Sequence, residues 1–149
     1  MSVETNLTAA QRDDLRAVAA MIISPSSEYN VPGADDAVIQ ADMLATLGRD
    51  ALAVGAALDH LARLAGKPLA ALDADRREAV AKEFRASGGV PAATLTRVVL
   101  QCYYRDDRVL RSLGLELRPP FPQGDVLEQG DWSLLDPVKK RASTLRRTS

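Results

Sequence analysis

Few residues of this chain are of the types that perform bond-making chemistry. His60 is the only histidine, and Asp59 and Arg63 lie close to it in the sequence. A general base needs a nucleophile or a substrate proton within reach, and the sequence identifies no such partner for this imidazole. Because a lone histidine is a weak signal, we interpret His60 as a structural or surface residue.

Cys102 is the only cysteine, which excludes an internal disulfide and a zinc site built from several cysteines. It falls on the apolar face of a predicted helix, where cysteine usually behaves as a small hydrophobic side chain. A nucleophilic thiol would need a neighbouring base and an electropositive environment. We therefore expect Cys102 to be structural.

Two pairs of carboxylates, Asp35-Asp36 and Asp106-Asp107, stand at predicted helix starts. Carboxylates at these positions cap free amide groups and complement the helix dipole, and their spacing matches no calcium-binding loop. Gly66-Lys67 lacks the other residues of a phosphate loop, and the chain has no dinucleotide-binding fingerprint. We expect no catalytic residues, metal or cofactor in this chain itself.

The elements that would position these residues are predicted to be helices. Apolar residues recur three and four positions apart from Leu15 to Ile22 and again from Leu95 to Cys102, which is the spacing of one helix face. Five or six helices with no convincing strand predict an all-α protein. The expected caps, interruptions and stops are Thr8 with Gln11, Asp35, Gly48, Gly66, Asp73, Gly88-Gly89, Asp106 or Asp107, Gly114, and Asp136 followed by Pro137.

Length and composition limit the classes of protein to which this chain can belong. A chain of 149 residues, 26% charged and 46% hydrophobic, is typical of one ordinary globular domain. The net charge of -1 gives no overall attraction to nucleic acid or to an anionic membrane. The first residues show neither a basic region before an apolar run nor twin arginines, so we expect no signal peptide and a cytoplasmic location. We also expect no membrane span, since no stretch approaches ~18 apolar residues.

The chain divides into a flexible start (residues 1–7), a helical domain (8–114), an extended proline-rich arm with a short helix (115–141) and a disordered basic tail (142–149). Phe121 and Trp132 are large anchors of the kind that carry interface energy. The arm is therefore expected to contact a partner, to cover the helices of its own chain, or to do both. The predicted partner-binding residues are Tyr103, Tyr104, Arg105, Pro119, Pro120, Phe121, Pro122 and Trp132.

Three motifs, YYRDDRVLRSLG, RPPFPQG and EQGDWSLLDPVKKR, resemble the C-terminal half of the gluconate 2-dehydrogenase subunit 3 family. The segments LTAAQRDDLRAVAAMII, SPSS and VPGADDA are similar to the opening of that family. The resemblance extends from about Leu7 to Arg141 and consists of short motifs, with no catalytic signature. It implies a small accessory subunit of a dehydrogenase whose large subunit is a flavoprotein of the glucose-methanol-choline (GMC) oxidoreductase class. That large subunit binds FAD and oxidises an alcohol or sugar hydroxyl, and a cytochrome subunit often completes the complex.

The sequence thus favours a non-catalytic small subunit that binds and stabilises a flavoprotein and supports its folding. Many members of the family carry a twin-arginine signal, which this sequence lacks, so a cytoplasmic two-component enzyme fits better than an exported one. Two alternatives stay open. One is a stand-alone helical interaction module or homo-oligomer, and the other is a small enzyme that uses His60 with an unidentified aspartate.

Overall fold

The structure of the chain, a computed structural model, describes residues 7–117 and 129–145. The chain separates into two units, Met1–Leu117 and Arg118–Ser149, and each is considered by itself. Among the described residues every regular element is a helix, and the only pairing of β type is an isolated bridge between Ser26 and Val31. The predicted all-α fold is therefore confirmed.

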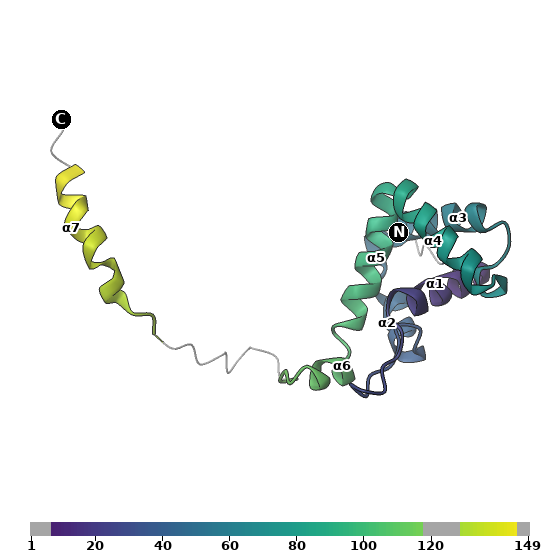
Figure 1. The fold of residues 1–149 in the computed structure, drawn as a ribbon, viewed down its shortest axis with the longest axis horizontal. Coiled ribbons are helices and arrows are strands. Elements are labelled where there is room, and N and C mark those ends of the chain that lie inside the picture. Colours follow the sequence, from purple (N-terminus) through teal and green to yellow (C-terminus); the bar gives the residue numbers. More distant parts are fainter. Residues whose placement is uncertain (1–6, 118–128, 146–149) are drawn as a thin grey trace. The chain divides into compact units, whose positions relative to one another are not determined.

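The first unit is a helical domain, and within its described residues six α-helices and two 3-10 helices follow one another (Figure 1). They are α1 (Ala9–Ile22), α2 (Ala37–Thr46), η1 (Gly48–Asp50), α3 (Ala51–Ala65), η2 (Leu69–Ala71), α4 (Ala74–Ser87), α5 (Gly89–Tyr103) and α6 (Asp107–Ser112). In the second unit, η3 (Trp132–Leu135) continues directly into α7 (Asp136–Leu145).

The core of the first unit is organised around α3, which packs against α1, α4 and α5 (Figure 1). Val54 and Leu58 of α3 are fully buried, as are Leu95 and Val99 of α5. Each pair is four residues apart and so lies on one face of its helix. Burying such a side chain stabilises the fold by roughly 1.5–3 kcal/mol. The apolar stripes read from the sequence are thus the faces that hold the helices together.

Several predicted helix boundaries are confirmed. Gln11 donates its backbone N–H to Thr8 Oγ1 at 3.2 Å, and Thr8 donates its own N–H to Gln11 Oε1 at 2.9 Å, which completes the capping box of α1. Asp73 accepts the N–H of Arg76 at 2.8 Å at the start of α4. Gly66 ends α3 in the left-handed region with a φ of 71°. The interruption expected at Gly48 is the short helix η1 between α2 and α3.

Two predicted caps were wrong. Asp36, not Asp35, caps α2 by accepting the N–H of Val38 at 3.0 Å, because the chain still turns at Asp35 and becomes helical only at Ala37. In the second unit the helical segment begins four residues before the predicted cap Asp136. Asp131 is the capping residue there, since it accepts the N–H of Ser133 at 3.0 Å. Helix α7 also continues to Leu145, past residue 142, where the basic tail was predicted to begin.

Candidate partner-binding surface

The two tyrosines of the predicted partner-binding corner have different environments. Tyr103 is only 4% exposed, and its hydroxyl donates a hydrogen bond to the carbonyl of Pro32 at 3.2 Å. Burial raises the pKa of this phenol. Tyr104 is 52% exposed, and its ring stands edge-on to that of Tyr103 with centroids 5.2 Å apart. Tyr103 therefore belongs to the core, and Tyr104 is the tyrosine that a partner can reach directly.

Arg105, the third residue of that corner, joins the end of α5 to α2. Its Nε donates to Asp42 Oδ2 at 2.5 Å, and its Nη2 donates to Thr46 Oγ1 at 2.7 Å. The hydrogen bond to Asp42 is the main reason why the pKa of Arg105 is raised. Because the guanidinium is already engaged, Arg105 has a structural role within the first unit.

An ion-pair cluster that the sequence analysis missed lies beside this corner. Arg108 Nη2 is 2.7 Å from Asp36 Oδ1 and 2.9 Å from Asp106 Oδ2, so one guanidinium bridges the N-terminal caps of α2 and α6. Hydrogen bonds from Arg108 lower the pKa of both carboxyl groups. The sequence identified the capping role of the aspartates, and Asp106 is the one of its pair that caps α6. Nothing in the local pattern indicated that a single arginine would join them.

Of the predicted contact residues in the arm, Trp132 lies within the described part of the chain. Pro119, Pro120, Phe121 and Pro122 lie outside the described residues. Trp132 opens η3 and is 66% exposed. Its position is fixed locally by Asp131, whose carboxylate accepts hydrogen bonds from the N–H of Ser133 and from its hydroxyl, the latter at 2.6 Å.

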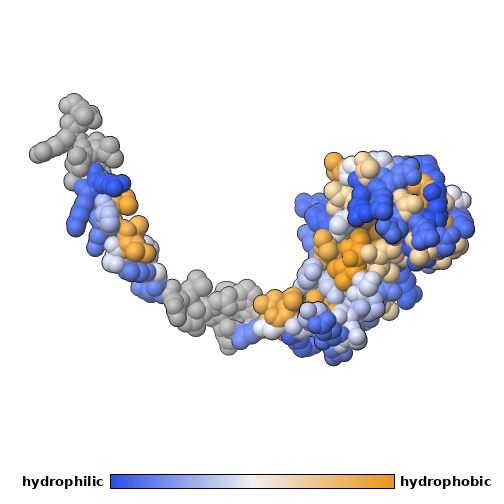
Figure 2. All heavy atoms as spheres, in the orientation of Figure 1, coloured by the Kyte–Doolittle hydropathy of each residue, from blue (hydrophilic) through white to orange (hydrophobic). Residues whose placement is uncertain are grey.

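The segment formed by η3 and α7 has an exposed apolar side that the sequence analysis did not recognise as a set. Leu134, Leu135 and Val138 are 74%, 42% and 60% exposed. Figure 2 shows hydrophobic atoms along one side of α7 and hydrophilic atoms along the other. The spacing i, i+1, i+4 is the signal that could have revealed this side. Such a helix of ten residues is only marginally stable alone in water, so covering its apolar side would stabilise it.

His60 has a neighbour that could not be inferred from the sequence. Its Nε2 lies 2.9 Å from Ser87 Oγ, and its ring lies 5.8 Å from that of Phe84. The Ser87 hydroxyl also donates to the carbonyl of Glu83 at 2.8 Å. A hydroxyl has one proton, so in this arrangement His60 is the donor to Ser87. A general base would have to accept that proton, so the contact supports a structural role for both residues.

Cys102 has the environment of a buried thiol. It is 3% exposed, and burial raises its pKa above the ordinary value, although Thr46 and Arg105 act in the opposite direction. Its Sγ lies 3.7 Å from Thr46 Oγ1 and 3.4 Å from Arg105 Nη2. The neutral thiol is a poor nucleophile, so this geometry is that of a packed side chain.

Neither a set of metal-binding side chains nor a membrane-spanning helix occurs in the part of the chain that the structure describes. No group of three or more histidine, cysteine, aspartate or glutamate side chains is placed to hold a metal ion in 7–117 or 129–145. No helix in these ranges is both long and apolar enough to cross a bilayer.

Comparison with known proteins adds no relative to this description: the chain matches no protein-family model, no curated protein and no solved structure. The resemblance to the gluconate 2-dehydrogenase subunit 3 family therefore rests on the sequence motifs alone.

Proposed function

We propose that this chain is the non-catalytic small subunit of an FAD-dependent dehydrogenase complex. Its partner would be a large flavoprotein of the GMC oxidoreductase class that acts on an alcohol or sugar hydroxyl. FAD and the catalytic residues would belong to the flavoprotein. The small subunit would bind the flavoprotein, stabilise it and assist its loading with FAD, in the cytoplasm.

The observation that carries this proposal is the exposed apolar side of η3 and α7. Trp132, Leu134 and Val138 are each at least 60% exposed within one short helical segment. Exposed apolar groups that gather in one place are typical of protein-binding surfaces, and an amphipathic helix commonly binds by laying that side into a groove. The same segment includes WSLLDPVKKR, the larger part of the motif EQGDWSLLDPVKKR, on which the family resemblance partly depends.

Accessory action of this kind needs no chemistry from the small subunit. A protein that binds the folded flavoprotein and not its unfolded chain stabilises it by mass action, by about 2.7 kcal/mol when its free concentration is 100 times the dissociation constant. FAD is retained only by the folded flavoprotein in this scheme. Flavin content of the purified complex is thus the readout that follows the proposed function most directly.

Trp132→Ala is the test variant. Truncating a large aromatic anchor typically costs ~2 kcal/mol, which is about a thirtyfold weaker dissociation constant. A large flavoprotein of the GMC class would be co-expressed with this chain, and the complex would be isolated by pull-down, assayed for flavin and titrated by calorimetry. His60→Ala is the control and should bind as the unmodified chain does. Equal affinities for the two variants, or full flavin loading and activity of the flavoprotein without this chain, would refute the proposal.

A homo-oligomer or stand-alone interaction module is the second candidate. The exposed side of η3 and α7 favours it as well, because an apolar helix side can pair with the same side of a second copy. Light scattering of the purified chain separates the two proposals. A monodisperse oligomer that Trp132→Ala dissociates supports the second candidate, and a monomer supports the first.

A further inference from the structure

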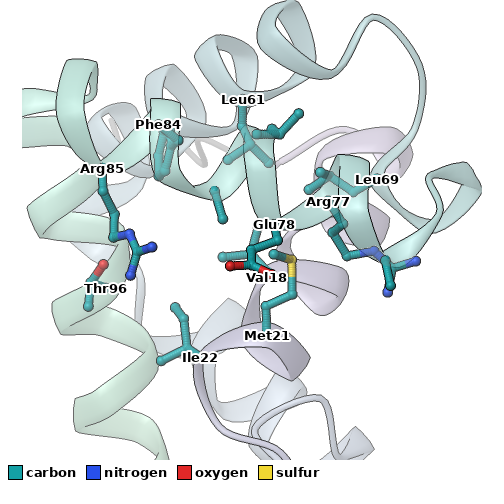
Figure 3. A pocket seen from close by; sticks show the side chains of 13 residues that line it. Val18, Met21, Ile22, Leu61, Leu69, Arg77, Glu78, Phe84, Arg85 and Thr96 are labelled. Atoms are coloured by element: carbon teal, nitrogen blue, oxygen red, sulfur yellow. The ribbon is translucent and has the colours of Figure 1, made fainter.

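A groove on the first unit has not been used by the proposed function. It lies between α1, α3, α4 and α5 and has a volume of about 580 Å³, which is within the usual size range of ligand pockets. Its floor and walls are mainly apolar. The apolar residues that line it are Val18, Met21, Ile22, Leu61, Leu69, Ala74, Val80, Ala81 and Phe84 (Figure 3).

Four polar residues complete the lining: Arg77, Glu78, Arg85 and Thr96. In Figure 3 the guanidinium of Arg85 and the carboxylate of Glu78 both point toward the middle of the groove, whereas the guanidinium of Arg77 points away from it. Arg77 Nη2 donates to the carbonyl of Leu72 at 2.8 Å, whereas the buried Nε of the same side chain has no hydrogen-bond partner among the described residues. Thr96 Oγ1 donates to the carbonyl of Ala92 at 3.0 Å, which leaves its lone pairs but not its proton for a ligand.

The charges at the mouth of the groove are not balanced. Glu78 is paired with Lys82 at 2.9 Å, and the hydrogen bond from Lys82 is the largest cause of its lowered pKa. Arg85 forms no ion pair with any residue in the part of the chain that the structure describes, and Glu78 is the carboxylate whose pKa it also helps to lower. The groove thus combines an apolar floor with Arg85, a cation that points into it and has no carboxylate in contact in the described part of the first unit.

We propose that this groove binds a single-chain anionic amphiphile, an acyl chain that ends in a carboxylate. The acyl chain would lie on the floor formed by α1, α3 and α4. The carboxylate would pair with Arg85 at the mouth, because a guanidinium is well suited to hold a carboxylate by two parallel hydrogen bonds. Glu78 would oppose that head group, so the two charged residues at the mouth should have opposite effects on affinity.

Because removing the Arg85 charge and removing the Glu78 charge should change the affinity in opposite directions, the two variants test the proposal together. Dodecanoate, below the concentration at which it forms micelles, would be titrated into the full chain and followed by amide chemical shifts of the groove residues and by calorimetry. Exposed ion pairs contribute ~0.2–1 kcal/mol. Arg85→Gln should therefore weaken binding by about 1.4- to 5-fold, and Glu78→Gln should strengthen it by a similar factor. Arg63→Gln, which removes a charge from exposed α3 surface outside the groove lining, should leave the affinity unchanged.

Two further measurements test the location and the chemistry. Ala81→Phe places a ring in the groove and should reduce dodecanoate binding at least tenfold, with thermal unfolding used to show that the variant is folded. If it does not fold, the charge variants decide alone. Dodecyltrimethylammonium, which has the same chain and a cationic head, should bind more weakly than dodecanoate to the unmodified chain and more tightly to Arg85→Gln than to the unmodified chain.

The alternative occupants appear as distinct results. Equal binding of the anionic and cationic probes would show a non-selective apolar surface and would overturn the proposal. No binding of dodecanoate together with Arg85-dependent binding to phosphatidylglycerol vesicles would assign the site to a lipid surface and would overturn it too. The flavoprotein is absent from all of these titrations, so their outcome is independent of the proposed function.

Discussion

Replacing Arg108 by alanine should destabilise the first unit in a way that depends on pH. Arg108 donates to Asp106 through Nε and Nη2, both at 2.9 Å, and to Asp36 through Nη1 at 3.2 Å and Nη2 at 2.7 Å. Hydrogen bonds to charged groups contribute about 1.5–3 kcal/mol when well shielded. The Arg108 side chain is 40% exposed, so solvent screening reduces the total. We expect a loss of ~1–2 kcal/mol, or roughly 4–8 °C in Tm for a domain of this size.

The matched control lies one turn further along α6. Arg111 is 3.6 Å from Asp107, and both side chains are at least 60% exposed, so Arg111→Ala should cost less than ~0.5 kcal/mol. Chemical unfolding of both variants measures the difference. Equal losses in the two variants would refute the assignment of Arg108 as the residue that joins α2 to α6.

Acid should remove the difference between the unmodified chain and Arg108→Ala. The pKa values of Asp36 and Asp106 are lower in the folded chain than their ordinary value of 3.8, so unfolding takes up protons in this range. The stabilisation is complete above the unfolded pKa and is lost as the pH falls through the folded pKa values. The gap between the two unfolding free energies should therefore be constant near neutral pH and shrink below about pH 4. A gap that acid leaves unchanged would contradict the mechanism.

The other structural predictions concern a hydroxyl and two glycines. Tyr103→Phe should lower the free energy of unfolding by ~1 kcal/mol, because the Pro32 carbonyl loses its donor. Tyr104→Phe should change it by less than ~0.5 kcal/mol, and equal effects of the two variants would contradict the buried hydrogen bond. Gly66→Ala should cost ~1–2 kcal/mol, since φ is 71° and a Cβ there would meet nothing that compensates. Gly55 lies inside α3, and Gly55→Ala should stabilise the fold by up to ~1 kcal/mol, because the added Cβ would make only ordinary contacts, at 3.7 Å with Gln11 and 3.8 Å with Leu7. A loss of stability at Gly55 or a gain at Gly66 in thermal unfolding would refute the argument.

The helices and many of their ends could be predicted because the signals are local. The capping box of Thr8 and Gln11, the cap Asp73 and the stop at Gly66 depend on residues within four positions of each other. The errors at Asp35 and Asp136 have a related origin. Where two residues that can cap a helix lie close together in the sequence, either can be the N-terminal cap. The conformation of the chain before the helix decides which of them it is.

The environments of Tyr103, Tyr104 and Arg105 were harder to predict because they are set by contacts across long sequence separations. Tyr103 and Tyr104 are adjacent and chemically alike, yet one bonds to Pro32, 71 residues away, and the other is exposed. Arg105 reaches Asp42 over 63 residues, and Arg108 reaches Asp36 over 72. Local periodicity contains no information on which helix end lies opposite another. The exposed side of η3 and α7, in contrast, has a local signature and could have been found.

Arg108 also attaches the short helix α6 to the rest of the first unit. Helix α6 has six residues and buries only Val109, so packing alone attaches it weakly to the other helices. The hydrogen bonds from the Arg108 guanidinium to Asp36 therefore hold α6 against the start of α2.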